Sequence, residues 1–182
     1  LIMQKGEGHH PHGLPDPWPV ADFIQLYSID IPLPALIDVS YGPHPKQLLH
    51  FWKARSDRPT PLAFYIHGGG WNTGDRLNGQ EVFFREMLAH GISVVSVEYR
   101  FISEATADGE MPPVRGPLFD AARALQFVRS NANAWGIDKQ RIGACGGSAG
   151  GCTSLWLAFR DDLADLQSND PVARESTRLM CA

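Results

Sequence analysis

The sequence has few cysteines and no excess of positive charge, and each shortage excludes a class of protein. Three cysteines in 182 residues, Cys145, Cys152 and Cys181, are too few and odd in number for a disulfide framework. We expect Cys145 and Cys152 to behave as small buried hydrophobic side chains. A net charge of −4 and an isoelectric point near 5.9 argue against nucleic-acid binding, which needs a basic face.

The sequence also lacks a long hydrophobic run. No apolar stretch approaches the roughly 20 residues that cross a membrane, so we predict no membrane span. Hydrophobic residues make up 43% of the chain and charged residues 20%, which is ordinary for one folded domain with a core. We therefore predict a single domain over residues 1–182, and the sequence leaves its compartment and oligomeric state open.

Residues 1–20 are rich in glycine, proline and histidine and show no hydrophobic period, which predicts an extended arm. His9, His10 and His12 stand close together there and raise the alternative of a metal site. No acidic or cysteine partner lies at ligand spacing, so we interpret the three as part of a solvated tail. We predict neither a metal nor an organic cofactor.

Strand and helix signals alternate from residue 62 onward, which predicts an α/β sheet, mostly parallel, with helices on both faces. Two earlier β segments, separated by a turn rich in glycine and proline, predict an antiparallel lead-in. The predicted strands are 36–41, 47–52, 62–66, 92–99 and 141–145, and the predicted helices are 80–90, 118–135 and 152–159.

Two connecting segments carry their own expectations. We expect residues 101–115 to be irregular, because Gly109 and the pair Pro112-Pro113 break any helix. We expect Gly136 to stop the helix before it and Asp138 to open the turn into the strand at 141–145.

The stretch Gly146-Gly147-Ser148-Ala149-Gly150-Gly151 lies between a short apolar run and a helix-compatible run. A strand, small residues around a serine, and then a helix are the context of a G-x-S-x-G nucleophile elbow. Such a turn lifts the serine hydroxyl clear of the sheet and strains the serine backbone. Because strand and helix nearly touch, the residues two positions on either side must be small, as Gly146 and Gly150 are. Ser148 is therefore our candidate nucleophile.

A second motif, His67-Gly68-Gly69-Gly70-Trp71, directly follows the predicted strand 62–66. Its glycines let the backbone turn N–H groups outward into an anion-binding concavity. Acyl transfer needs such donors, because negative charge grows on the carbonyl oxygen in the transition state. A flexible turn is the simpler interpretation of a glycine triplet alone. Two such motifs, each after a predicted strand, together favour an acyl-transfer site.

With these motifs the chain resembles the hormone-sensitive-lipase-like esterase group of the α/β-hydrolase superfamily, which includes bacterial carboxylesterases described as esterase/lipase. The resemblance covers roughly residues 35–160. It also rests on Gly74-Asp75-Arg76, Val97-Glu98-Tyr99-Arg100, Asp120 and Trp135-Gly136-Ile137-Asp138.

The resemblance implies Ser148 as the nucleophile and an oxyanion hole made by the N–H groups of Gly69, Gly70 and Ala149. It implies that His67 supports the loop rather than carrying protons. Trp71 either lines the acyl or alcohol pocket or packs in the core, and the sequence leaves both open.

Three further matched residues, Asp75, Arg100 and Asp120, are structural rather than catalytic by this resemblance. The segment after Arg100 departs from the group's pattern. It is longer than the short Leu-x-Pro-Glu connection typical of the group, which leaves the substrate preference open.

No histidine follows Ser148, although the triad order in this fold is serine, acid, histidine. The acids after the elbow follow its helix too closely to end a further strand; they are Asp161, Asp162, Asp165, Asp170 and Glu175. We therefore expect the chain to be the N-terminal portion of a longer enzyme that supplies the acid and the histidine later. We also expect residues 179–182 to begin a strand-like run. The alternative is a natural short form that has lost catalysis.

The sequence thus predicts a serine carboxylic-ester hydrolase that acts on a small-molecule ester through an acyl-enzyme intermediate. One alternative is another enzyme on the same fold, such as an arylformamidase or other amidase, a peptidase, or an esterase for polysaccharide acyl groups. Another alternative is a non-catalytic, hydrolase-like interaction module, which the absent histidine permits.

Overall fold

The structure, a computed structural model, describes residues 33–77 and 80–182. The chain divides into two compact units, Leu1–Asp30 and Ile31–Ala182, and all described residues belong to the second. The predicted arm at residues 1–20, with His9, His10 and His12, therefore lies outside the described residues.

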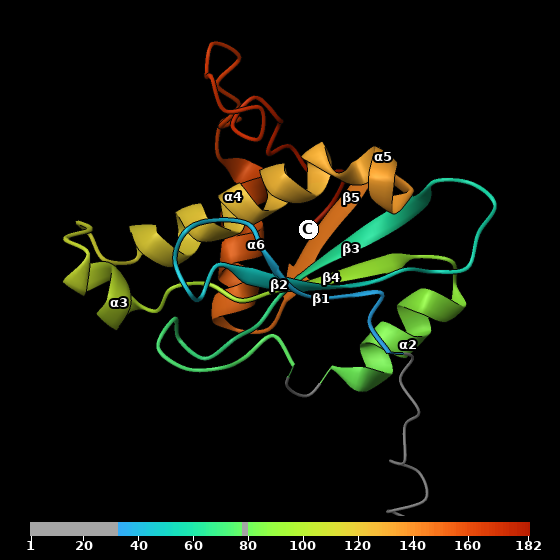
Figure 1. Cartoon of the computed structure of the whole chain (residues 1–182). Coiled ribbons are helices and arrows are strands. Elements are labelled where there is room, and N and C mark those ends of the chain that lie inside the picture. The colour runs from blue at the N-terminus through green and yellow to red at the C-terminus, as the bar shows by residue number, and fades with distance from the viewer. Residues whose placement is uncertain (1–32, 78–79) are drawn as a thin grey trace, which may run out of the picture. The chain divides into compact units, whose positions relative to one another are not determined.

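The described unit is built on a five-stranded sheet in the order β1-β2-β4-β3-β5, which Figure 1 shows in its centre. The strands are β1 (Leu36–Ser40), β2 (Leu48–Trp52), β3 (Thr60–Ile66), β4 (Ser93–Val97) and β5 (Ile137–Gly146). β2 is antiparallel to both of its neighbours, whereas β3 is parallel to β4 and to β5. The sheet is mixed, with two antiparallel and two parallel pairings, and the predicted antiparallel lead-in and the parallel strands after it are confirmed.

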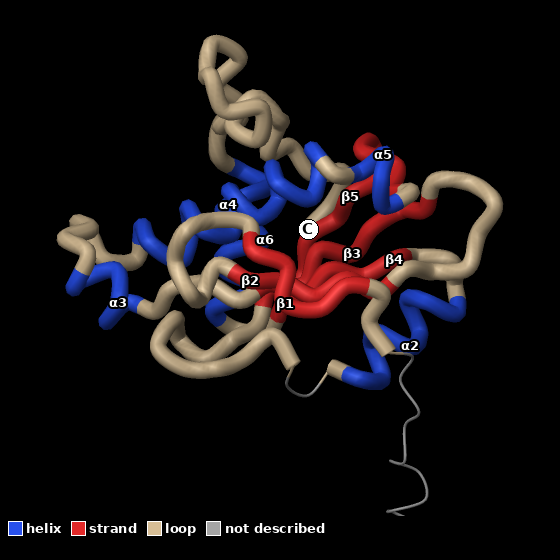
Figure 2. Tube along the Cα trace, viewed as in Figure 1, coloured by secondary structure: helices blue, strands red, loops and turns tan. Residues whose placement is uncertain are grey.

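Helices cover both faces of this sheet (Figures 1 and 2). They are α2 (Glu81–Ala89), α3 (Ile102–Ala107), α4 (Arg115–Ser130), α5 (Ala132–Trp135) and α6 (Ala149–Phe159). α4 and α6 pack on one face, and α2 packs on the other. None of the helices within the described ranges is long and apolar enough to cross a membrane.

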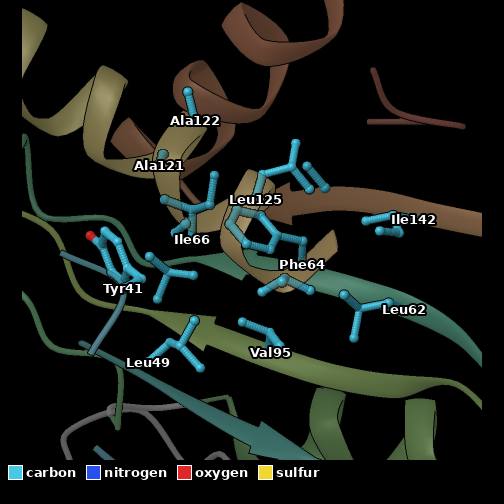
Figure 3. Packing of buried hydrophobic residues seen from close by; sticks show 14 of the residues in the cluster. Tyr41, Leu49, Leu62, Phe64, Ile66, Val95, Ala121, Ala122, Leu125 and Ile142 are labelled. Carbon is cyan, nitrogen blue, oxygen red and sulfur yellow. The ribbon is translucent and has the colours of Figure 1, made fainter. Parts of the chain in front are cut away.

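The alternation of side chains along β3 creates two separate cores. Leu62, Phe64 and Ile66 point toward α4, where they meet Ala121 and Leu125 (Figure 3). The intervening residues of β3, Ala63 and Tyr65, point the other way, toward Phe84 of α2. Because successive residues of a strand face opposite sides, a strand between two helical layers must be apolar throughout. This explains the continuous apolar run that predicted β3.

Residues 102–107 form the helix α3, so the prediction of an irregular segment there is wrong. The Glu104 carboxylate accepts a hydrogen bond of 2.7 Å from the Phe101 N–H and so caps the first turn. The helix ends before Gly109, which has a φ of 81°. Gly109 therefore terminates a six-residue helix rather than preventing it.

The predicted helix 118–135 is two helices, α4 and α5, because the chain breaks at Asn131. The Asn131 side chain donates a hydrogen bond of 2.8 Å to the Phe127 carbonyl and competes with the helical ladder. Gly136 ends α5 in the left-handed region (φ 62°, ψ 43°), as predicted. Asp138 lies inside β5 rather than in a turn before it, because β5 starts at Ile137.

The cysteines have three different environments and all carry free thiols. Cys145 is half-buried in β5, and burial, followed by the nearby Cys181 thiol, raises its pKa to about 11. Cys152 is exposed, so the prediction that it is buried is wrong. Its neighbour Thr153 points into the core instead, and α6 turns Cys152 outward.

Residues near the C-terminus lie along the free edge of β5, where Cys181 forms a parallel bridge with Gly143. The Ala144 N–H donates to the Cys181 carbonyl at 3.0 Å, and the Met180 N–H donates to the Ile142 carbonyl at 2.8 Å. The strand-like run predicted for residues 179–182 is therefore confirmed.

A buried ion pair ties α4 to the chain after β4. The Arg100 guanidinium donates to both oxygens of Asp120 at 2.9 and 2.8 Å, and the Gln47 amide donates to the same carboxylate at 2.8 Å. The hydrogen bonds from Arg100 to Asp120 raise the pKa of Arg100. Asp120 is only 2% exposed, which makes its role structural, in line with the expectation for Arg100 and Asp120.

We predict that Asp120→Ala lowers the free energy of unfolding by about 3 kcal/mol, because removal of one partner leaves a buried charge unpaired. Urea unfolding followed by circular dichroism measures this loss. Glu86→Ala, which removes the solvent-exposed partner of Arg85, serves as the control and leaves the midpoint close to that of the unmodified protein. Equal midpoints for the two variants would contradict the structural role of Asp120.

Candidate active site

Three parallel strands end level with one another and define the edge at which the site forms. Ile66 of β3 pairs with Val97 of β4 and with Gly146 of β5. The segments that follow these strands therefore emerge side by side. They contain the glycine motif after Ile66, Glu98 after Val97, and the serine motif after Gly146. Binding sites of parallel sheets lie at this carboxyl edge.

Ser148 occupies the apex of the turn between β5 and α6, with a φ of 52° and a ψ of −119°. A residue other than glycine rarely adopts this conformation, which stores strain. The Ser148 side chain is exposed, and Ser148 is the residue directly before the first turn of α6. The turn therefore holds its hydroxyl in solvent at the positive end of a helix.

The strain at Ser148 follows from how closely α6 approaches β3. A Cβ placed on Gly146 would lie 2.1 Å from the Ile66 carbonyl oxygen, and one placed on Gly150 would lie 2.0 Å from the same oxygen. Neither position accepts a side chain. The prediction that the residues two positions on either side of Ser148 must be small is confirmed.

The glycine motif after β3 turns through three consecutive residues with positive φ, namely Gly69 (109°), Gly70 (62°) and Trp71 (57°). The turn closes on itself, because the Asn72 and Thr73 N–H groups both donate to the Gly69 carbonyl. We call residues 67–76 the glycine loop. A Cβ on Gly69 would lie 2.0 Å from the Thr73 carbonyl oxygen, so this position requires glycine.

The glycine loop lies against the turn that carries Ser148. A Cβ on Gly68 would lie 2.8 Å from the Gly147 carbonyl oxygen and 3.5 Å from the Ser148 Cβ. Within residues 33–77 and 80–182, the N–H groups of Gly69, Gly70 and Ala149 donate no hydrogen bond. The structure thus brings the two sequence motifs together and leaves these three donors free.

Trp71 joins the glycine loop to two helices. Its indole N–H donates to the Thr153 hydroxyl of α6 at 3.0 Å, and its carbonyl accepts from the Ile102 N–H of α3 at 2.8 Å. The partly buried ring packs against the core cluster on the α4 and α6 side. Core contact is therefore observed for Trp71, and its role in lining the acyl or alcohol pocket stays a prediction.

His67 is buried beneath the glycine loop, with 3% of its surface exposed. Its Nδ1 contacts the Gly68 carbonyl at 2.7 Å, its Nε2 contacts the Glu98 carboxylate at 3.1 Å, and its ring stacks on Tyr99. Because a carbonyl oxygen only accepts, Nδ1 is the donor toward Gly68. Both ring nitrogens are engaged, so His67 is placed to hold the loop rather than to take a proton from Ser148.

Glu98 is a site residue for which the sequence predicts no role, although it lies within Val97-Glu98-Tyr99-Arg100. Its side chain is 5% exposed and lies between His67 and Arg76, whose guanidinium Nη1 approaches at 3.6 Å. A charged residue directly after a valine-rich strand was the available signal, because burial of a carboxylate is costly unless it is paired.

The other described histidines have local partners. His44 accepts from the Lys46 N–H, and His90 contacts the Glu86 carbonyl at the end of α2. His50 is buried in β2 and accepts from the Asp38 N–H. Burial, followed by the charge of Arg76, lowers the pKa of His50. In the part of the chain that the structure describes, no side chain forms a hydrogen bond with the Ser148 hydroxyl.

The acidic residues after α6 stabilise their own loop. Asp162 accepts hydrogen bonds from the Ser176 hydroxyl and the Thr177 N–H, and Glu175 pairs with Lys139 at 2.8 Å. Across the described ranges, no three His, Cys, Asp or Glu side chains are grouped so as to hold a metal ion. The candidate site therefore consists of Ser148, the glycine loop and the start of α6.

Comparison with known proteins places these features in a family. The BD-FAE family model matches residues 50–179, a range that contains both the glycine loop and the serine turn. Gut esterase 1 of Caenorhabditis elegans is 35% identical over 128 residues, which are 66% of this chain and 22% of that protein. Esterase LipC of Mycobacterium tuberculosis is 34% identical over 139 residues, which are 73% of this chain and 30% of that protein.

Solved structures agree with the fold. An acetyl ester-xyloside bifunctional hydrolase from Caldicellulosiruptor lactoaceticus superimposes with a TM-score of 0.61 at 28% identity, over 77% of this chain and 48% of that chain. An esterase from Thermogutta terrifontis superimposes with a TM-score of 0.61 at 23% identity, over 78% of this chain and 50% of that chain. The α/β-hydrolase fold is thereby confirmed.

The chain spans only 20–35% of the length of the first four curated relatives. Within that span the matched residues carry the whole glycine loop and the serine turn, which are the two motifs that the resemblance rested on. The chain belongs to the BD-FAE family, within the hormone-sensitive-lipase-like esterase group of the α/β-hydrolase superfamily.

Proposed function

We propose that this chain provides the nucleophile and the oxyanion hole of a serine carboxylic-ester hydrolase. One observation carries the proposal. Ser148 is held in a strained backbone conformation with its side chain in solvent, beside three N–H groups that have no partner among the described residues. Strain of this kind persists only where the surrounding structure enforces it, and it concentrates at active sites.

In the proposed reaction, the Ser148 hydroxyl oxygen attacks the carbonyl carbon of the ester while a base takes its proton. The carbonyl oxygen becomes negatively charged and accepts hydrogen bonds from the Gly69, Gly70 and Ala149 N–H groups. Collapse of this intermediate expels the alcohol, which receives the proton, and leaves an acyl-enzyme. A water molecule then attacks the acyl group by the same steps and releases the carboxylic acid and free Ser148.

The general base and its orienting carboxylate belong, in this proposal, to residues outside the 182. His67 has both ring nitrogens engaged, and His44, His50 and His90 contact Lys46, Asp38 and Glu86 in turn. The curated relatives are three to five times as long as the matched segment, which gives room for a histidine and an acid. The proposed activity therefore concerns the full-length protein.

The relatives support an ester as the substrate. Their names describe esterases, among them a versiconal hemiacetal acetate esterase of Dothistroma septosporum that is 34% identical over 124 residues. The 28% identical acetyl ester-xyloside hydrolase favours a second candidate, an esterase for acyl groups on a carbohydrate. Both candidates use the same nucleophile and oxyanion hole and differ only in the alcohol.

A substrate panel separates the two candidates. We expect the full-length protein to hydrolyse p-nitrophenyl acetate in either case, and to release acetate from acetylated xylan if the carbohydrate ester is its substrate. N-formylkynurenine, an arylformamidase substrate, is the amide control. Turnover of p-nitrophenyl acetate without acetate release from xylan would remove the second candidate, and turnover of the amide alone would contradict ester hydrolysis.

We predict that Ser148→Ala in the full-length protein abolishes ester turnover while folding persists, because alanine has no nucleophilic oxygen. Ser154→Ala is the matched control. Ser154 lies on the same helix, is buried, and donates only to the Gly150 carbonyl. Steady-state hydrolysis and circular dichroism of both variants give the test, and retained turnover in Ser148→Ala would contradict the assignment of the nucleophile.

We predict that Gly69→Val lowers kcat by about 10²-fold or more, the usual scale for loss of one oxyanion donor. The substituted side chain collides with Thr73 and displaces the loop. Gly91→Val is the control, because Gly91 also has a positive φ (74°) but has open space around it and lies far along the chain from both motifs. An unchanged kcat in folded Gly69→Val would exclude Gly69 from the oxyanion hole.

A further inference from the structure

The glycine loop is held at both of its ends by one buried carboxylate, that of Glu98. His67, the first residue of the loop, contacts Glu98 Oε1 through Nε2 at 3.1 Å. Arg76, the last residue of the loop, approaches Glu98 Oε2 through its guanidinium Nη1 at 3.6 Å and through its backbone N–H at 3.4 Å. The two oxygens of the Glu98 carboxylate therefore contact the opposite ends of a ten-residue segment.

Glu98 is itself fixed from the other side. It directly follows β4, its backbone carbonyl accepts a hydrogen bond of 2.6 Å from the Tyr41 hydroxyl, and its N–H donates to the Leu48 carbonyl. Lys46 Nζ lies 3.9 Å from Glu98 Oε1. The Glu98 backbone is thus hydrogen-bonded to Tyr41 and Leu48, and its carboxylate lies near Lys46. These contacts fix the position of the carboxylate relative to the sheet.

The fixed position of Glu98 matters because the glycine loop contains a strained residue, Trp71. Trp71, which carries a side chain, has a φ of 57°, whereas Gly69, Gly70 and Gly74 adopt positive φ angles without a steric penalty. Gly74 folds back so far that a Cβ there would lie 2.4 Å from His67 Nδ1. A strained conformation persists only where surrounding contacts over-determine it. The contacts of Glu98 with His67 and Arg76 contribute to that constraint at the ends of the loop, and those of Trp71 with Thr153 and Ile102 contribute in its middle.

We propose that Glu98 is a positioning residue for the oxyanion hole: through His67 and Arg76 it fixes the glycine loop so that the Gly69 and Gly70 N–H groups face the reacting carbonyl. This inference rests on the proposed function. Glu98 does not touch the substrate. Its effect falls on the chemical step, because the N–H groups that it positions bind the charge that develops in the transition state.

Neutralising Glu98 while keeping its shape isolates this role. In Glu98→Gln the side chain retains its size, but Lys46 loses its carboxylate partner, Arg76 keeps only its ion pair with Asp38, and the His67 contact loses its charge assistance. We expect kcat for p-nitrophenyl acetate to fall by about 10- to 100-fold, since a 1 Å displacement of a positioning group costs on that scale. We expect KM to stay within about twofold, because ground-state binding does not use the oxyanion donors.

A second variant tests the same link from the other end of the loop. Arg76→Gln removes the guanidinium and should lower kcat in the same direction as Glu98→Gln. The double variant should lose less than the product of the two single losses, because both substitutions remove the Arg76–Glu98 contact, whereas Arg76 also pairs with Asp38 and Glu98 also contacts His67. If Glu98→Gln does not fold, folded Arg76→Gln decides the matter, and an unchanged kcat there overturns the proposal.

The matched control is Asp162→Asn. Asp162 is also a partly buried carboxylate that accepts several hydrogen bonds, but it lies beyond the opposite end of α6 from Ser148. Asp162→Asn should lower the midpoint temperature of thermal unfolding without lowering kcat. An equal loss of kcat in Asp162→Asn and Glu98→Gln, or an unchanged kcat in folded Glu98→Gln, overturns the proposal.

The same experiment includes Ser148→Ala, which keeps the two proposals apart. Turnover that survives in Ser148→Ala means that the proposed function has failed. Turnover that is lost in Ser148→Ala but unchanged in folded Glu98→Gln means that the nucleophile assignment holds and the positioning role of Glu98 alone has failed.

Discussion

The close approach of α6 to the end of β3 is the constraint on which the site depends. The Ile66 carbonyl oxygen leaves no room for a Cβ at Gly146 or Gly150, which lie on either side of the turn. A chain that leaves β5 and enters a helix in so little space must bend sharply, and Ser148 takes the bend. The exposure of its hydroxyl, the free Ala149 N–H and the strain all follow from this one contact.

The second half of the site is built on the same sheet edge. β3, β4 and β5 end in register, so the glycine loop, Glu98 and the serine turn are neighbours although they are far apart in the sequence. The sheet supplies rigidity and the loops supply chemistry. The buried Glu98 carboxylate after β4 contacts both ends of the glycine loop, in which Trp71 has a strained backbone conformation. The contacts beneath the loop thus offset the strain within it.

The strands and the serine turn could be predicted from sequence because their signals are local. The run 62–66 is apolar throughout, and the small residues around Ser148 meet a steric need that composition reveals. α3 was missed because Glu104 caps a helix only six residues long, and the break at Asn131 was missed because a single side-chain hydrogen bond decides it. The Glu98 contacts join residues 22 to 31 positions apart, which no periodicity encodes. The sequence predicted a buried Cys152 because α6 carries apolar residues on all of its sides. One of these sides, with Cys152, Leu155 and Phe159, is exposed in the structure.

The central claim is that Ser148 is an activated nucleophile, and covalent labelling tests it most directly. The full-length protein is treated with a fluorophosphonate, which reacts with activated serines, and the adduct is mapped by tandem mass spectrometry. We expect one adduct, on Ser148, with ester turnover lost in proportion to labelling. If the folded protein gains no adduct, Ser148 is not an activated nucleophile, and a hydrolase-like module without catalysis is favoured. An adduct on a different residue would also contradict the assignment of Ser148.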